Sequence, residues 1–141
     1  MNNDRQVLSN VLKTAQMGQV GIRSVMPYAQ SGMLKKALRT QQQEYDTIEQ
    51  EAYAIAASRG WDLPELNPMS KLLSNASAKT AALFGDTDSK IAAMMINGST
   101  KGMITGLKQL HKGTDDASVS TLSQKLIDTQ YTNIRQMQGY V

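Results

Sequence analysis

Apolar side chains recur along most of this chain at the three- and four-residue spacing of one face of an α-helix. The clearest case lies between residues 33 and 59, where steps of four and three alternate through Leu34, Leu38, Gln41, Tyr45, Ile48, Ala52, Ile55 and Arg59. This spacing predicts a long helix whose seam packs against neighbouring helices. Gly60 follows the last of these positions and predicts the end of the helix.

The same periodicity predicts a helix near each end of the chain. The first covers residues 4–26, with Asp4 or Asn3 as its cap, and Pro27 disfavours helix in the residue before it. Its expected buried stripe is Leu8, Val11, Leu12, Ala15, Ile22 and Val25. The last helix opens at Ala117 or Ser118 and is expected to bury Val119, Leu122, Leu126, Ile127, Ile134 and Met137.

The middle of the chain predicts a long crossover followed by more helix. The stretch WDLPELNP, from Trp61 to Pro68, combines apolar residues with two prolines that forbid a regular helix. A short helix is expected at 68–84 and another at 88–111, and one bent helix over 68–111 remains an alternative. No stretch shows the alternation of a strand. The predicted fold is therefore an all-α four-helix bundle with a crossover.

Composition narrows the chemistry before any site is considered. The chain has 141 residues, 40% hydrophobic and 19% charged, which suits a single domain over 1–141. It has no cysteine and one histidine, His111, which excludes a disulfide framework, a thiolate zinc site and any site with two histidine ligands. No apolar run is long enough to span a bilayer and the first ten residues do not form a secretory signal, so a cytoplasmic protein is expected.

Particular residues of the second and last helices resemble the ferritin-like superfamily. They are Glu44-Tyr45-x-x-Ile48-x-x-Glu51-Ala52 with Gly60-Trp61, and Leu126-Ile127-Asp128-Thr129-Gln130-x-x-Asn133-Ile134-x-x-Met137. The resemblance implies a ferritin-like bundle with one long connection, in a small bacterial branch without an assigned function. It also implies where a metal site would lie.

The metal ligands of that superfamily are not present at the corresponding positions. The superfamily uses glutamates and Glu-x-x-His pairs, whereas the corresponding pairs here read Gln41-x-x-Glu44 and Gln130-x-x-Asn133. Hard divalent cations need carboxylates or imidazoles. We therefore expect no metal and no cofactor, and interpret Gln41, Glu44, Gln130 and Asn133 as a hydrogen-bonded polar layer at a degenerate metal site, with Glu44 at its edge reaching water.

Three glycines, Gly98, Gly102 and Gly106, lie on one face of the predicted helix at 88–111. Each costs roughly 1 kcal/mol relative to alanine in a helix, so a compensating contact is expected. Close packing of another helix, at Gly18 and Gly21, would supply it. A groove that admits a ligand or a second chain is the alternative.

The remaining sequence features give weaker indications of function. Four lysines, Lys90, Lys101, Lys108 and Lys112, follow the opposite side of that helix without arginines or aromatics, so nucleic-acid binding is not favoured. Met94 and Met95 are adjacent, about 100° apart, and are not expected to face one site. His111 suits the last turn of its helix without a catalytic role.

No catalytic constellation stands out in the sequence, so a non-enzymatic function is expected. One interpretation is a bundle that acts through protein contacts or self-association. The alternatives are a small-ligand-binding module with a cavity at the former metal position, and a weak nucleic-acid-binding bundle.

Overall fold

The computed structural model describes residues 3–63 and 87–141, and within them every regular element is a helix. The long helices are α1 (Asp4–Val25), α2 (Gly32–Arg59), α4 (Thr87–His111) and α5 (Ala117–Gln138), and a single 3₁₀ turn, η1 (Met26–Tyr28), follows α1. The all-α prediction and the four long helices are confirmed. The predicted helix at 68–84 lies outside the described residues.

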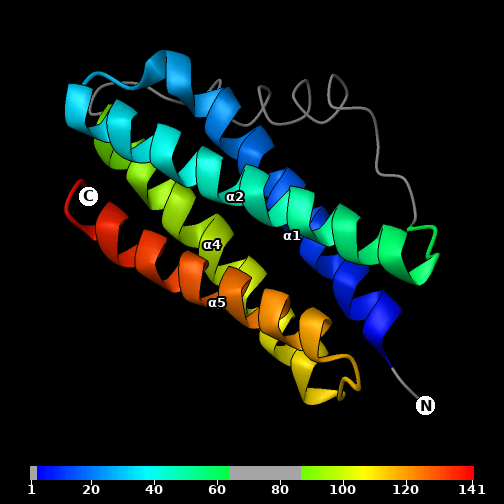
Figure 1. The fold of residues 1–141 in the computed structure, drawn as a ribbon. Helices are drawn as coiled ribbons and strands as arrows, with labels where there is room; N and C mark the ends of the chain where they lie inside the picture. Colours follow the sequence, from blue (N-terminus) through cyan, green and yellow to red (C-terminus); the bar gives the residue numbers. More distant parts are fainter. Residues whose placement is uncertain (1–2, 64–86) are drawn as a thin grey trace.

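The four helices form two antiparallel pairs, α1 with α2 and α4 with α5 (Figure 1). α1 also contacts α4 and α5, and α5 contacts α2, so that α2 and α4 lie across the bundle from each other. α2 and α4 run in the same direction, which is the arrangement that a single crossover between the two pairs requires.

The core follows the predicted seams closely. One cluster of buried residues draws on all four helices, and in α1 it includes the whole predicted stripe from Leu8 to Val25. In α2 the seam is buried except at its C-terminal end, where Ile55 is half-buried and Arg59 is exposed. In α5 only Ile134 of the predicted positions is half-buried rather than buried.

Side-chain caps fix where α2 and α5 begin. The hydroxyl of Ser31 accepts a hydrogen bond from the backbone N–H of Leu34, and Asp116 accepts from Ser118 and Val119. α2 ends at Gly60, whose φ of 65° places it in the left-handed region that glycine tolerates. The predicted cap of α1 is wrong, since the side chain of Asn3 makes no cap bond.

Asp4 instead holds the loop between α4 and α5. Its buried carboxylate accepts hydrogen bonds from the backbone N–H groups of Asp115 and Asp116, at 2.9 and 3.2 Å. At the other end of the bundle Asp88 does the same for the turn before α2, accepting from Gln30 and Ser31. Each carboxylate supplies an acceptor for two backbone N–H groups of a loop, which cannot find one in the regular hydrogen bonding of a helix.

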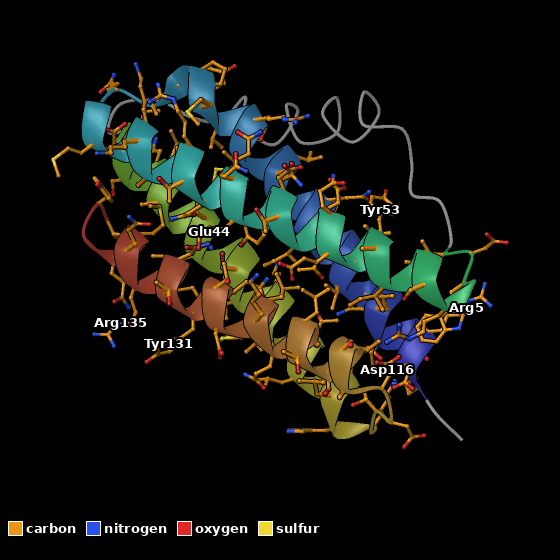
Figure 2. All side chains as sticks on the ribbon, in the orientation of Figure 1. Arg5, Glu44, Tyr53, Asp116, Tyr131 and Arg135 are labelled. Atoms are coloured by element: carbon orange, nitrogen blue, oxygen red, sulfur yellow. The ribbon has the colours of Figure 1, made fainter. Side chains whose placement is uncertain are left out.

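At the end of the bundle where Asp4 holds the loop before α5, an ion pair ties α2 to α5. Arg59 donates to the carboxylate of Asp116 at 2.7 Å, and Arg5 donates to the backbone oxygen of Asp62 nearby. Figure 2 shows Arg5 and Asp116 at this common end. The hydrogen bond from Arg59 holds the pKa of Asp116 below its usual range, and the backbone N–H groups of the cap add to this effect.

Candidate functional site

Three buried amides lie in the middle of the core, where the sequence predicted them. Gln41 on α2 and Gln130 and Asn133 on α5 are each 2% exposed. They do not form the predicted hydrogen-bonded layer, because Gln41 donates to Gln136 at 2.9 Å rather than to the other two. Gln136 was not predicted, since it lies outside the apolar stripe of its helix.

Two of these amides are left without full hydrogen bonding. Among the described residues, the buried polar atoms with no partner are Oε1 of Gln130, Nδ2 of Asn133, Nδ2 of Asn10 and Oγ of Ser123. An unsatisfied buried polar atom costs about 1–3 kcal/mol. Such groups in a folded protein require an explanation, and a ligand or ordered water is one of the standard ones.

Tyr45 lies between the amides and α4. Burial raises the pKa of its phenol, while the polar side chains of Ser99 and Asn133 beside it favour the phenolate and oppose part of this rise. The phenol therefore stays protonated at neutral pH and serves as a neutral hydrogen-bonding group.

Glu44 does not belong to the core. It is half-buried and lines a shallow depression between α2 and α5, together with Thr121, Gln124 and other polar residues of α5. Partial burial raises the pKa of its carboxyl group. The predicted place of Glu44, at an edge that reaches water, agrees with this position, but Glu44 shares no hydrogen bond with the three amides.

The residues at the position where the ferritin-like resemblance would place a metal site do not suit a metal ion. The core offers neutral amides, the one carboxylate of the set faces another surface, and hard divalent cations require charged oxygen ligands or imidazole. Within residues 3–63 and 87–141, no three His, Cys, Asp or Glu side chains group in a way that could hold a metal.

We expect the purified protein to hold no stoichiometric iron, manganese or zinc inside the bundle. The amides at Gln41, Gln130 and Asn133 supply too little negative charge to displace the hydration shell of these ions. Elemental analysis after dialysis measures this directly. Two tightly held metal ions per chain would contradict the prediction.

The glycines of α4 do not behave as one packing face. A β-carbon on Gly102 would collide with the amide end of Gln130, and one on Gly106 would lie 3.1 Å from Ile127. A β-carbon on Gly98 would meet nothing within 4 Å among residues 3–63 and 87–141. The expectation of a packing contact is therefore supported at Gly102 and Gly106, and within the described residues it is not supported at Gly98.

The predicted partner glycines of α1 also have different roles. A β-carbon on Gly18 would lie 2.8 Å from Cε2 of Tyr45, so Gly18 admits a ring of α2 rather than the backbone of α4. Gly21 faces α4, but a β-carbon on Gly21 would find the methyl of Met95 as its nearest neighbour, at 3.8 Å.

The space beside Gly98 belongs to a groove of about 640 Å³ between α1 and α4. Such a volume lies within the range of small-molecule sites. Its floor reaches Gln41, Tyr45 and Gln130, so it adjoins the buried amides. Its walls are Asn10, Lys13, Thr14, Met17, Gly18, Val20, Gly21, Ile22 and Ser24 of α1 and Met94, Met95, Gly98, Ser99, Lys101, Gly102 and Thr105 of α4.

One end of the groove carries two lysines, and the other end carries the methionines of α4 together with Ser24 of α1. α1 and α4 run antiparallel, and contacts of Thr14 with Gly102 and of Gly21 with Met95 fix their register. Lys13 and Lys101 therefore lie towards one end, and the methionines of α4 lie towards the other. A ligand in this groove would meet cations at one end and thioether and aliphatic groups at the other.

Sequence reasoning missed most of this groove. Met94 and Met95 both line it, contrary to prediction, because the groove is wide enough to receive side chains 100° apart. Lys101 was placed on the far side of the helix from the glycines but reaches the groove edge. The sequence signal for the groove was the pair of small residues Gly18 and Gly21 of α1 opposite Gly98. The same pair is equally compatible with close packing of the two helices, so it could not distinguish a groove from a contact.

Comparison with known proteins adds a likeness of fold. The structure matches the "Crystal structure of DUF305 fragment from Deinococcus radiodurans" with a TM-score of 0.78, 14% sequence identity, and coverage of 99% of this chain and 95% of that one. No protein-family model matches the sequence, and no curated protein does. At this identity the match shows an all-helical fold in common and nothing about activity.

No helix in the described part of the chain is both long enough and apolar enough to cross a membrane.

Proposed function

We propose that this protein is a non-enzymatic helical bundle that binds a small molecule in the groove between α1 and α4. The observation that carries the proposal is Gln130, which is 2% exposed, lines the groove floor and has an amide oxygen without a partner in the described residues. A ligand, with the water that accompanies it, would satisfy this atom.

The way the groove is built supports a binding role. Gly98 weakens its helix by roughly 1 kcal/mol relative to alanine, and no packing contact in the described residues requires a glycine there. What its missing side chain provides is room in the groove. Apolar side chains, among them Val20 and Ile22 of α1 and Met94 and Met95 of α4, line part of the groove beside a few polar groups, as is usual for small-molecule sites.

The chemistry of the groove supports binding without catalysis. None of the described residues that line it is an aspartate, a glutamate, a histidine or a cysteine. The hydroxyl groups of Thr14, Ser99 and Thr105 therefore have no carboxylate or imidazole beside them to act as a general base. The phenol of Tyr45 is held in its protonated form by burial.

We further propose that the bundle is a ferritin-like fold that has lost its metal site. The shared direction of α2 and α4 supports this, because ferritin-like bundles contain one long crossover. The amides Gln41, Gln130 and Asn133 would then occupy the former ligand positions, and the groove would extend to them.

Action through protein contacts or self-association has weaker support. The exposed large apolar residues among those described are spread over all four helices, η1 and the C-terminal residue, and no helix contributes more than two of them. They are Met17, Tyr28, Met33, Tyr53, Ile104, Leu107, Tyr131 and Val141.

Native mass spectrometry of the protein purified from its own host tests the binding role and reports the subunit number at the same time. We expect a retained small molecule that is lost in Gly98→Leu, because leucine at this position fills the groove. Gly32→Leu is the matched control, since Gly32 also has free space around it but lies at the start of α2, away from the groove.

A binding assay with the neutral apolar dye phenylnaphthylamine covers the case in which the natural ligand is lost during purification. We expect fluorescence enhancement with the wild type and with Gly32→Leu, and none with Gly98→Leu. No retained molecule together with equal dye binding by all three proteins would reject the groove as a binding site.

A further inference from the structure

We infer that the ligand is a single-chain anionic amphiphile, such as a free medium-chain fatty acid, with its carboxylate at Lys13 and Lys101 and its chain along the methionines. This inference rests on the proposed binding function and adds the class and the orientation of the ligand. Three observations carry it: the charge of the groove, its unpartnered polar atoms and the gradient along its length.

Every charged side chain among the described residues that line the groove is positive. Lys13 of α1 and Lys101 of α4 lie on opposite walls, and the described lining contains no acidic residue. Neither lysine forms an ion pair within residues 3–63 and 87–141. Two ammonium groups facing one space attract an anion and repel a cation, and each can donate a charge-assisted hydrogen bond to a carboxylate.

The unpartnered polar atoms lie at the same end. Asn10 lies one helical turn before Lys13 on α1, and its buried Nδ2 is a donor with no acceptor in the described chain. This amide adds a third donor for a carboxylate. Oε1 of Gln130, next to Gly102 on the floor, accepts instead, and it suits an ordered water or a hydroxyl that accompanies the headgroup.

The other end of the groove suits an alkyl chain. Met17, Val20 and Ile22 of α1 and Met94 and Met95 of α4 all line the groove, and the methyl of Met95 lies beside Gly21. Methionine side chains are flexible and polarizable, so they adapt to a chain of variable shape. The span from Thr14 to Ser24 along α1 corresponds to about 15 Å at the rise of an α-helix. An elongated ligand with one polar end therefore fits the groove better than a compact polar one.

Isothermal titration of the full-length protein with three ligands of equal chain length tests the headgroup. The ligands are decanoate, decanol and decyltrimethylammonium, all kept below their aggregation limits. We expect decanoate to bind most tightly, decanol about tenfold more weakly, and the cation not measurably, because the lysines repel it. Affinity for decanoate should fall with added salt, while affinity for decanol should not.

The double variant Lys13→Gln with Lys101→Gln tests the assignment of the two lysines. We expect it to bind decanoate about tenfold more weakly and decanol unchanged. Lys36→Gln, an exposed lysine of α2 away from the groove, is the matched control and should bind both ligands as the wild type does. Gly98→Leu should abolish binding of both.

The outcomes separate the two proposals. If decanol and decanoate bind equally, and Gly98→Leu blocks both, the binding function stands and the anionic class is wrong. If the double lysine variant binds decanoate normally, the carboxylate does not lie between these lysines and the orientation is wrong. If neither decanoate nor decanol binds and the dye also fails to distinguish Gly98→Leu, both proposals are wrong.

Discussion

Gly18→Leu is expected to destabilise the protein by about 1–3 kcal/mol or more, the range typical of overpacking a core contact. A β-carbon at this position would lie 2.8–3.0 Å from three ring atoms of Tyr45, which is 4% exposed. A buried aromatic ring cannot turn aside as the end of a long side chain can. Urea unfolding followed by circular dichroism gives the free energy of unfolding.

The same substitution at Gly98 is the control for Gly18. Because a side chain at Gly98 would meet none of the described residues at close range, leucine there should be neutral or stabilising, by up to about 1 kcal/mol from improved helix propensity. Equal unfolding midpoints for the two variants would show that the close approach of Gly18 to Tyr45 is not part of the packing.

The loss of stability on Gly102→Leu should lie between the effects of the same substitution at Gly98 and at Gly18. A β-carbon there would meet Gln130 and lie 3.1 Å from the methyl group of Thr14. Gly102→Leu should therefore lower the midpoint more than Lys101→Leu, its exposed neighbour. The amide end of Gln130 can shift, so the loss at Gly102 should be smaller than at Gly18.

Replacing the amide of Gln130 by an apolar side chain of similar shape is expected to stabilise the protein. For Gln130→Met we expect a gain of about 1–3 kcal/mol, because the wild-type amide leaves one buried oxygen unsatisfied, whereas Asn133 is kept because its side chain hydrogen-bonds the phenol of Tyr45. The urea midpoint should rise with an unchanged slope. Gln43→Met, an exposed glutamine of α2, should stay within about 0.5 kcal/mol of the wild type.

The same substitution also separates stability from binding. If Gln130 is retained for a ligand, Gln130→Met should bind decanoate more weakly while the protein unfolds at a higher urea concentration. Such opposite changes are typical of positions kept for function at a cost in stability. A lower midpoint for Gln130→Met would mean that the amide oxygen of Gln130 has a partner after all.

The structure changes the expected effect of single substitutions in this core. If Gln41, Glu44, Gln130 and Asn133 shared one hydrogen-bonded layer, Asn133→Ala would leave its hydrogen-bond partners unsatisfied. Stability would then be recovered only by replacing the amides together with apolar residues. Gln41 bonds to Gln136 instead, so no such rescue is required. Gln130 and Asn133 can be replaced without removing a hydrogen bond from Gln41.

The sequence alone determined the helices and their buried faces. Periodic apolar positions such as Leu34, Leu38 and Ile48 all lie in the core, because a helix presents every third or fourth residue to the same side wherever it packs. It also predicted that Gln130 and Asn133 face the core, since they follow the buried stripe of α5. These are local properties, and they depend only on spacing along one helix.

Only the tertiary structure decided what those faces meet. Gly98, Gly102 and Gly106 are equivalent in the sequence, yet Gly102 and Gly106 touch α5 while Gly98 opens into a groove. Asp4 looks like a helix cap but holds a loop more than one hundred residues away. Such differences depend on the register and separation of α1, α4 and α5, which are set by the packing of all helices together rather than by any one of them.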